Sequence, residues 1–349
     1  MVDKAYPNLS IIIPTYNDAS TIRQVLESIL ELDYPSRFEI IVVDDCSTDE
    51  TFEILKEFLS MNKITVVRHE RNMGLASAYN SGISSSSGDF LLLLQSDCVP
   101  KSKSWLRELV DVMLSDEKIA IVSSKNQLSE EVWNTYGFLD KLYSAKELLP
   151  RTLYFGRGVL IRKSVFEKVG LFDDKSHKLA GEDFDFFIRV KKFGYKIICT
   201  NSILLHLHSI RQRSLWKKLQ KEFLYGMAEA KVVRKHWKFI YGGLNWRNKS
   251  HTGKNDALRD YAAPYILLMF SLNIISRVLG NMIFSLLFSI MMLSPIILFS
   301  AFLTKQSLCF LKDIKGNYIL KIFILFSLNT MRQILFIIGF FIGLFKKRV

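Results

Sequence analysis

The amino-acid sequence predicts an α/β fold in which a mainly parallel central sheet is followed by amphipathic and transmembrane helices. Two observations support the sheet: short apolar runs alternate with helical patterns over the first hundred residues, and several of these runs end in an acidic residue. Strands that are apolar on both sides indicate a parallel sheet covered by helices on both faces. A third observation, the long apolar segments beyond residue 260, predicts the membrane helices.

The first hundred residues contain four expected strands and three expected helices in alternation. The strands are LSIIIPTY, FEIIVVDD, KITVVRHE and DFLLLLQSD, and the helices are ASTIRQVLESILEL, TDETFEILKEFLS and LASAYNSGISSS. In the first helix, Ile22, Val25 and Leu26 recur at helical spacing, as do Ile29 and Leu30.

Residues 100–209 are expected to complete the same domain, although their pattern is less regular. The sequence predicts a helix near 103–115, a strand at IAIVSS, helices at SVFEKVG and EDFDFFIRVKKFG, and a strand at YKIICTNSILLHLHS. We therefore place the first domain at residues 1–209.

Residues 210–260 form a basic amphipathic region. In the expected helix 214–238, the main apolar side chains fall within about a third of the helical circle. They are Leu215, Trp216, Leu219, Phe223, Met227, Ala230, Val233 and Trp237. Five lysines lie outside that arc, whereas Arg234 falls within it. A basic amphipathic helix with tryptophan anchors is typical of a membrane interface, and the alternative is a helix that packs on the first domain.

The C-terminal region, residues 261–349, contains two to three hydrophobic segments that we interpret as a membrane anchor. Residues 282–303 are long enough to span a hydrocarbon core of roughly 30 Å, and residues 261–280 are moderately apolar. Segment 318–345 carries Arg332 near its middle, where an arginine costs about 2.5–3.5 kcal/mol on insertion scales. We expect Arg332 to face protein, or the segment to break there. Basic residues on both sides of a single span leave the topology open.

Charge is divided unevenly between the first domain and the tail. Residues 1–209 carry 25 Lys+Arg and 29 Asp+Glu, whereas residues 210–349 carry 22 Lys+Arg and 5 Asp+Glu. A basic excess beside apolar runs favours an anionic membrane as partner over a nucleic acid. The four cysteines are widely spaced with no CxxC pair, so neither a disulfide framework nor a zinc site is expected. The N-terminus lacks an apolar run, so no cleavable signal peptide is expected.

Acidic residues stand where the expected strands end. Asp44 and Asp45 close IIVVDD, and Asp97 closes LLLLQSD. Because ligands bind outside the carboxyl ends of parallel strands, these carboxylates are candidates to bind a nucleoside or a divalent cation. The alternative is that such acids cap the next helix, which we favour for Asp49. For Asp97 we favour ligand binding, because Val99-Pro100 indicates a turn.

Five motifs, taken together in their order along the chain, resemble those of a known family. LSIIIPTYND, IIVVDDCSTDET, ERNMGLASAYNSGI, GDFLLLLQSD and GEDFDFFIRVKKFGYKI have the spacing of glycosyltransferase family 2. The resemblance covers about residues 8–209 and implies the GT-A (nucleotide-diphospho-sugar transferase) fold. It also implies inverting transfer from a nucleotide-diphosphate sugar, usually with Mg²⁺ or Mn²⁺.

For the donor, the resemblance implies a set of binding residues drawn from four motifs. They are Pro14, Thr15, Tyr16, Asp44, Asp45, Asn72, Gly74 and Gln95. Asp44 would contact the base, with Asp45 beside it, and Asn72 and Gly74 would shape the same pocket.

For the chemistry, the resemblance implies a metal ligand at Asp97, the last acid of the family's DXD motif. His206 matches a histidine near the metal or the diphosphate, with His208 as the alternative. Asp183 matches the catalytic base, and Glu182 lies beside it. Arg157, between two glycines, is a candidate for contact with the acceptor or a phosphate, and a solvated loop arginine is the alternative.

Two departures from the family pattern matter. The DXD motif reads Gln95-Ser96-Asp97, so its first acid is replaced by an amide that can still hydrogen-bond a ribose but weakens metal binding. The QxxRW motif of processive synthases has its nearest match at residues 212–216, where Leu215 replaces the arginine. The second departure argues against a polymerising synthase.

The sequence therefore predicts a membrane-attached glycosyltransferase that transfers a sugar to a polyprenyl phosphate or a lipid-linked saccharide. Its catalytic domain is expected to face the cytosol, with the tail integral to the cell membrane. Two alternatives stay open: a processive polysaccharide synthase, and an inactive scaffold that only binds a nucleotide sugar.

Overall fold

The computed structural model describes residues 6–148, 150–152, 157–176, 180–207, 214–241, 269, 272–273 and 282–345. The chain divides into two compact units. The first contains residues 1–134 and 147–212, and the second contains residues 135–146 and 213–349. Residues 135–146, which were expected within the first domain, group with the C-terminal helices in the structure.

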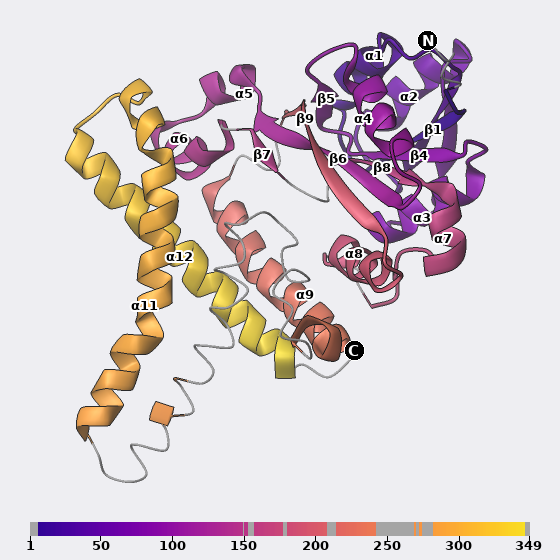
Figure 1. Cartoon of the computed structure of the whole chain (residues 1–349). Coiled ribbons are helices and arrows are strands. Elements are labelled where there is room, and N and C mark those ends of the chain that lie inside the picture. Colours follow the sequence, from indigo (N-terminus) through magenta and orange to yellow (C-terminus); the bar gives the residue numbers. More distant parts are fainter. Residues whose placement is uncertain are drawn as a thin grey trace. The chain divides into compact units, whose positions relative to one another are not determined.

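The first unit is built on one mixed sheet (Figure 1). Its order over the described residues is β3-β2-β1-β4-β8-β6-β9-β5, with β7 paired to β6. The strands are β1 (Leu9–Thr15), β2 (Phe38–Asp44), β3 (Thr65–Arg68), β4 (Phe90–Leu94), β5 (Cys98–Pro100), β6 (Ile119–Leu128), β7 (Arg151–Thr152), β8 (Gly158–Arg162) and β9 (Lys196–His206). Strands β5, β7 and β8 run against the other six. The predicted α/β fold is confirmed, with antiparallel strands added to a parallel framework.

The sheet is buried on both faces because successive side chains of a strand point to opposite sides. In β4, Leu92 and Leu94 pack in a core with side chains of α1, α2 and α4, whereas Leu91 and Leu93 pack in a second core with side chains of α3, α7 and α8. The helices are α1 (Ile22–Leu30), α2 (Thr51–Ser60), α3 (Leu75–Ser85), α4 (Trp105–Leu114), α7 (Lys163–Val169) and α8 (Glu182–Lys192). The run of four leucines is therefore a central strand covered on both sides.

Strand direction brings separate motifs to one edge of the sheet. Thr15 at the end of β1 is paired with Asp44 at the end of β2, and β1 also runs parallel to β4. After β4 the chain turns, and Cys98 in β5 pairs with His206 at the end of β9. Because β8 runs in the opposite direction, Arg157 just before it reaches the same edge, where its carbonyl oxygen accepts a hydrogen bond from the Gln95 N–H (2.8 Å).

The second unit is helical in its described residues. It contains α6 (Phe138–Ser144), α9 (Leu215–Tyr241), α11 (Met282–Ser307) and α12 (Tyr318–Phe345), and α5 (Glu130–Thr135) lies at the boundary with the first unit. The expected amphipathic helix is confirmed as α9, which departs from helical geometry at His236. The expected apolar segment 261–280 lies almost entirely outside the described residues, so that prediction stays open.

One of the described helices is long and apolar enough to cross a membrane. It spans Tyr318–Leu344 with a mean hydropathy of 1.7, and just over a quarter of it is buried. Arg332 does not break this helix; it faces protein, which is one of the two outcomes expected from the sequence.

Candidate active site

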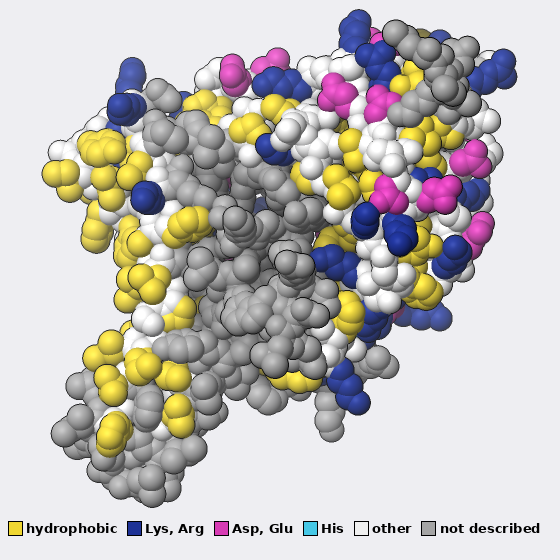
Figure 2. Space-filling model, viewed as in Figure 1, with side chains coloured by type: hydrophobic (Ala, Val, Ile, Leu, Met, Phe, Trp, Pro, Cys, Tyr) yellow, Lys and Arg dark blue, Asp and Glu magenta, His cyan; other side chains and the backbone are white. Residues whose placement is uncertain are grey.

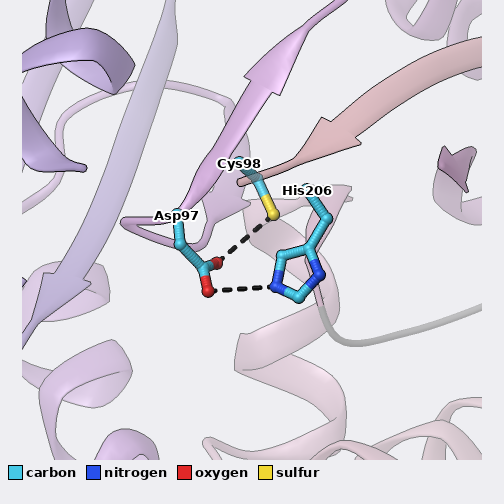
Figure 3. A group of neighbouring side chains, drawn as sticks. All are labelled: Asp97, Cys98 and His206. Carbon is cyan, nitrogen blue, oxygen red and sulfur yellow. Dashed lines mark hydrogen bonds and ion pairs between the residues drawn. The ribbon is translucent and has the colours of Figure 1, made fainter. Parts of the chain in front are cut away.

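The centre of the candidate site is a pair formed by Asp97 and His206 (Figure 3). The turn after β4 presents Asp97, β9 ends in His206, and the His206 Nε2 lies 3.0 Å from the Asp97 Oδ2. Both side chains are buried. The Leu207 N–H also donates to the Asp97 carbonyl oxygen (2.8 Å), so the two segments are tied through the backbone as well.

The charges around Asp97 keep it ionised although it is buried. Burial alone would raise the pKa of Asp97, but the adjacent His206 and the nearby Arg157 hold that pKa well below its usual range. Burial, followed by the charge of Asp97, instead raises the pKa of the Cys98 thiol. The Cys98 Sγ lies 3.5 Å from the Asp97 Oδ1 and donates to it. The site therefore offers an anionic oxygen ligand beside a neutral thiol.

These residues fit a divalent cation. One ligand atom from each of Asp97, Cys98 and His206 lies within 4.8 Å of the other two. A carboxylate oxygen suits Mg²⁺ and Mn²⁺, and an imidazole nitrogen is a further ligand that a transition-metal ion such as Mn²⁺ accepts. The protonated Cys98 is the poorest donor of the three, because a metal binds the thiolate form.

The position of the missing DXD acid is occupied by Gln95, but another carboxylate lies close by. The Ser96 hydroxyl donates to the Asp18 Oδ2 (2.6 Å), which also accepts from the Thr15 hydroxyl (3.2 Å) and the Tyr16 N–H (3.1 Å). Burial raises the pKa of Asp18, against these hydrogen bonds, and the charge of Asp97 adds to the increase. Asp18 was missed in the sequence analysis; its place in TYND after a strand gave the same signal as Asp44.

Asp44 and Asp45 anchor the loops around the site. Asp44 is fully buried, accepts from the Ser47 N–H (3.0 Å) and lies 3.1 Å from the Arg68 Nε. Asp45 lies 2.7 Å from the His69 Nδ1 and accepts from the Met73 and Gly74 N–H groups (both 2.8 Å).

The loop between His69 and α3 is fixed by these contacts. The His69 Nε2 reaches the Ser81 hydroxyl at 2.9 Å, so Asp45, His69 and Ser81 form a chain of hydrogen bonds. Gly74 has a φ of +91° at the start of α3, a conformation that favours glycine. The His69 ring is almost fully buried and bonded at both nitrogens, so His69 is a structural residue of this loop.

The remaining expected donor residues lie at the end of β1 and in the loop before α3. Pro14 and Thr15 are buried in β1, whereas Tyr16 and Asn72 are exposed. Exposure leaves Tyr16 and Asn72 accessible to a ligand. The buried Pro14 and Thr15 can present only backbone atoms or a small part of their side chains.

The two acids of GEDFD begin helix α8. Gly181 adopts a left-handed conformation with a φ of +94°, and Glu182 follows it as the first helical residue. Burial raises the pKa of Glu182 to about 8, and the neighbouring charge of Asp183 adds to this effect. Burial also raises the pKa of Asp183, although the Phe184 N–H donates to its Oδ1 (2.7 Å). The pair therefore retains a proton near neutral pH.

Tyr79 on α3 connects this acid pair to the Asp97 site. Burial raises the pKa of the Tyr79 hydroxyl, and the charges of Glu182, Asp183 and Asp97 raise it further. All three carboxylates therefore lie within electrostatic range of one side chain. Tyr79 was missed in the sequence analysis, because it looks like an ordinary apolar-face residue of its helix. His208 lies outside the described residues.

A sheet covered on both faces, with a carboxylate–imidazole pair just beyond the ends of its strands, has the architecture in which α/β proteins bind ligands at the carboxyl ends of their strands. The family model described as Glycosyl transferase family 2 matches residues 10–170, and the model described as Glycosyl transferase family group 2 matches residues 91–341. The chain therefore belongs to glycosyltransferase family 2 and is a glycosyltransferase.

Curated relatives agree with this assignment. The probable glycosyltransferase YdaM of Bacillus subtilis is 32% identical over 56% of this chain and 49% of its own length. The glycosyltransferase AglE of Haloferax volcanii is 27% identical over 65% of this chain and 74% of its own length. The chain thus spans about half the length of YdaM.

Solved structures share the fold. The mannosyltransferase PcManGT of Pyrobaculum calidifontis has a TM-score of 0.58 at 16% identity, covering 98% of this chain and 88% of its own. The structure of GalNAc-T7 has a TM-score of 0.52 at 19% identity, covering 72% of this chain and 59% of its own. These matches confirm the predicted GT-A fold.

Proposed function

We propose that the enzyme transfers a sugar, with inversion, from a nucleotide-diphosphate sugar to a polyprenyl phosphate or a lipid-linked saccharide. The observation that carries this proposal is the ionised Asp97, paired with His206 and within electrostatic range of the same tyrosine as Glu182 and Asp183. Asp97 and His206 suit a metal ion bound to the donor's diphosphate, and Glu182 and Asp183 suit removal of a proton from an acceptor hydroxyl. Inverting transfer to a hydroxyl uses both functions.

The first group is proposed to hold Mg²⁺ or Mn²⁺. The donor set of Asp97 and His206 supports this, and PcManGT was solved with GDP-Man and Mn²⁺ and GalNAc-T7 with UDP, GalNAc and Mn²⁺. When bound, such an ion supplies charge to stabilise the leaving nucleoside diphosphate. Arg157, within electrostatic range of Asp97, is proposed to add a second positive charge at a phosphate.

The second group is proposed to activate the acceptor. Asp183 would take the proton from an acceptor hydroxyl as the oxygen attacks the anomeric carbon from the face opposite the diphosphate. Glu182 would hold a proton beside it, because burial and the charge of Asp183 raise the pKa of Glu182. With a lipid phosphate as acceptor the attacking oxygen is already ionised, and Asp183 would then only position it.

Donor recognition is assigned to the end of β1 and the loops after β2 and β4. Tyr16 and Asn72 are exposed and can meet the nucleoside directly. Gln95 supplies an amide where the family's acid would bind the ribose. Pro14, Thr15, Asp44, Asp45 and Gly74 are proposed to shape this pocket through the backbone and the loop contacts described above.

A lipid-linked acceptor at the membrane is supported by the tail. A relative from Methanococcus voltae, 27% identical over 68% of this chain and 78% of its own length, is named a dolichyl N-acetyl-alpha-D-glucosaminyl phosphate 3-beta-D-2,3-diacetamido-2,3-dideoxy-beta-D-glucuronosyltransferase. The basic helix α9 and the apolar helix α12 suit a bilayer. We place the catalytic unit on the cytosolic side, where nucleotide sugars are made, and the enzyme in the cell membrane.

A processive polysaccharide synthase is the second candidate. A poly-beta-1,6-N-acetyl-D-glucosamine synthase of Staphylococcus epidermidis is 37% identical, but only over 26% of this chain. Leu215, the first residue of α9, stands where the synthase motif has arginine. The first candidate is therefore favoured.

The test is incubation of membranes containing the enzyme with labelled nucleotide sugars, followed by extraction into organic solvent. The proposal predicts label in a lipid of low mass, and loss of that label in Asp183→Asn if the acceptor is a hydroxyl. A long polymer would favour the synthase. Label confined to a small water-soluble product would overturn the lipid acceptor.

A further inference from the structure

Helix α12 has its polar residues inside and its apolar residues outside. A stripe of exposed side chains recurs every three or four residues along its length: Ile319, Phe323, Ser327, Met331, Ile334, Ile338 and Ile342. The opposite face is buried and includes Lys321, Asn329 and Gln333. A helix at the surface of a water-soluble protein has the reverse arrangement. The exposed stripe therefore suits acyl chains, and it leaves open whether α12 crosses the bilayer or lies along it.

The buried polar residues of α12 are bonded within the second unit. The Lys321 Nζ donates to the carbonyl oxygens of Leu311 (2.5 Å) and Ile314 (2.7 Å). The Asn329 amide donates to the Thr304 hydroxyl of α11 at 3.1 Å. These contacts hold one face of α12 against protein and so fix which face remains exposed.

The C-terminal half of α12 packs along α9 at unusually short range. A Cβ on Gly226 of α9 would lie 2.0 Å from the Phe336 carbonyl oxygen, and a Cβ on Gly339 of α12 would lie 2.0 Å from the Phe223 carbonyl oxygen. At Gly343 the nearest atom would be the Met227 carbonyl oxygen at 2.6 Å. Gly339 and Gly343 form the GxxxG spacing that lets two helix backbones meet. In this chain the partner of that face is α9.

Polar contacts join the same two helices at both ends of this stretch. The Arg332 Nε donates to the Glu222 Oε1 (2.8 Å), and the Tyr143 hydroxyl of α6 donates to the same oxygen (3.2 Å). Twelve residues further on in α12, the Arg234 Nη1 donates to the Leu344 carbonyl oxygen at 3.1 Å. The two helices therefore run in the same direction, with residues 222–234 beside residues 332–344.

Helix α9 cannot cross a bilayer. It carries seven Lys and Arg and two Glu in 27 residues, and its longest stretch free of these charges and of His lies between Glu222 and Glu229. A span needs about 20 apolar residues, and charges at the centre of a bilayer are costly. If α12 crossed the membrane, its half at 332–344 would take residues 222–234 of α9 in with it. The other half, about 14 residues, is too short to span alone at 1.5 Å per residue.

We propose that α12 does not cross the membrane but lies with α9 in the plane of its surface. The apolar stripe of α12 is the face that enters the acyl boundary, and the lysines and Arg234 of α9 contact the headgroups of anionic lipids. Charge complementarity selects this partner, because the paired helix α9 is basic and exposes Lys217, Lys221, Arg234, Lys235 and Lys238. The inference rests on the proposed membrane association and specifies which helix faces contact the lipid.

Helix α11 presents a different surface. Figure 2 shows hydrophobic side chains along it, and its exposed residues include Phe284, Ile290 and Ile297. Among the described residues, the close packing on α9 is made by α12, so the proposal concerns α12 alone.

The test is the sidedness of the two ends of α12 in sealed vesicles of known orientation. Single cysteines are placed at Asn317, before α12, and after Val349, in a chain whose Cys46, Cys199 and Cys309 are serine. A membrane-impermeant maleimide should label both ends from the same side, and Lys238→Cys on α9 should match them. Labelling of the two ends from opposite sides would overturn the inference while leaving membrane association intact.

A second measurement uses the purified full chain with vesicles of phosphatidylcholine, with and without 30% phosphatidylglycerol. Sedimentation with the anionic vesicles should exceed that with the neutral ones at least threefold and fall in Ile338→Asp. Met61→Asp changes an exposed apolar residue of the first unit and serves as control. Equal sedimentation of Ile338→Asp and the parent would refute the stripe as the lipid-facing surface. Failure of the parent to bind either vesicle would refute the proposed membrane association itself.

Discussion

At the scale of single residues, the site is organised by carboxylates that differ in their surroundings. Asp97 is buried beside His206 and keeps its charge, whereas Glu182 and Asp183 are buried beside each other and tend to keep a proton. Two buried acid sites in one domain thus have opposite proton affinities. This division suits a reaction in which one carboxylate binds a metal cation and another acid acts as the base that deprotonates a hydroxyl.

The pH dependence of the reaction follows from the acid pair. A base must be ionised, so with hydroxyl acceptors the rate should fall as pH drops through the raised pKa of the pair. The pKa of about 8 is that of Glu182, raised by burial and by the charge of Asp183, and Glu182→Gln removes this titration and leaves Asp183 as the only acid that sets the limb. The acidic limb of the pH–rate profile should therefore move to lower pH. Initial rates between pH 5 and 9 measure this shift, and an unmoved limb would show that the two acids are not coupled.

A matched control for this change is Glu167→Gln. Glu167 is an exposed acid on α7, and its replacement removes the same charge from the same unit. Its pH–rate profile should coincide with that of the parent enzyme.

The contacts of Asp45 predict how much its replacement lowers the free energy of unfolding. Asp45→Asn replaces a buried carboxylate that accepts from two backbone N–H groups and His69. Hydrogen bonds to charged groups contribute about 1.5–3 kcal/mol, so unfolding of the full chain should cost about 2–4 kcal/mol less. Denaturant unfolding measures it. Asp116→Asn, at an exposed ion pair with Lys196, should change stability by less than about 1 kcal/mol, and equal losses would argue against the loop anchor.

At the scale of elements, local patterns predicted most of the first unit. The apolar runs at β1, β2 and β4 and the 3.6-residue periodicity of α1 and α2 are set by burial, which sequence reveals directly. The antiparallel strand β8, which lies between β4 and β6, was not predicted. Its place in the sheet depends on pairing with segments that are distant in the sequence. The grouping of α6 with the C-terminal helices depends on a distant contact as well: Tyr143 reaches Glu222, 79 residues away.

The α9–α12 pair gives a prediction for one glycine. Alanine in place of glycine normally stabilises a helix by up to about 1 kcal/mol. At Gly226 the added methyl would lie 2.0 Å from the Phe336 carbonyl oxygen, so the helices must separate and Gly226→Ala should destabilise the chain by about 2 kcal/mol. Thermal unfolding in detergent measures it.

The control for this prediction is Gly137→Ala, where an added methyl meets nothing within 4 Å. It should change stability by less than about 1 kcal/mol. If Gly226→Ala were as stable as Gly137→Ala, the close backbone contact would not exist.

At the scale of the whole molecule, charge and chemistry are divided between two units. The first unit holds the candidate site and is slightly acidic, whereas the tail is strongly basic and apolar. This division suits the proposed reaction, in which the donor comes from water and the acceptor from a membrane.

The candidate site was predictable in part. Asp97 was identified from its place after β4, but its contact with His206 joins residues 109 positions apart and was suggested only by the family resemblance. Asp18 and Tyr79 were not identified, since an acid in a turn and a tyrosine on a helix are ordinary locally. Their importance comes from the edge of the sheet, which brings them near Asp97 and Asp183.

The most direct test of the central claim is calorimetric binding of UDP and GDP to the full-length enzyme with and without Mn²⁺. The account predicts that one of these nucleotides binds only with the metal, and that Asp97→Asn weakens this binding at least tenfold while Asp116→Asn leaves it unchanged. Binding that is equally tight without metal, or equally tight in Asp97→Asn, would contradict the assignment of Asp97 as the metal ligand of the donor site.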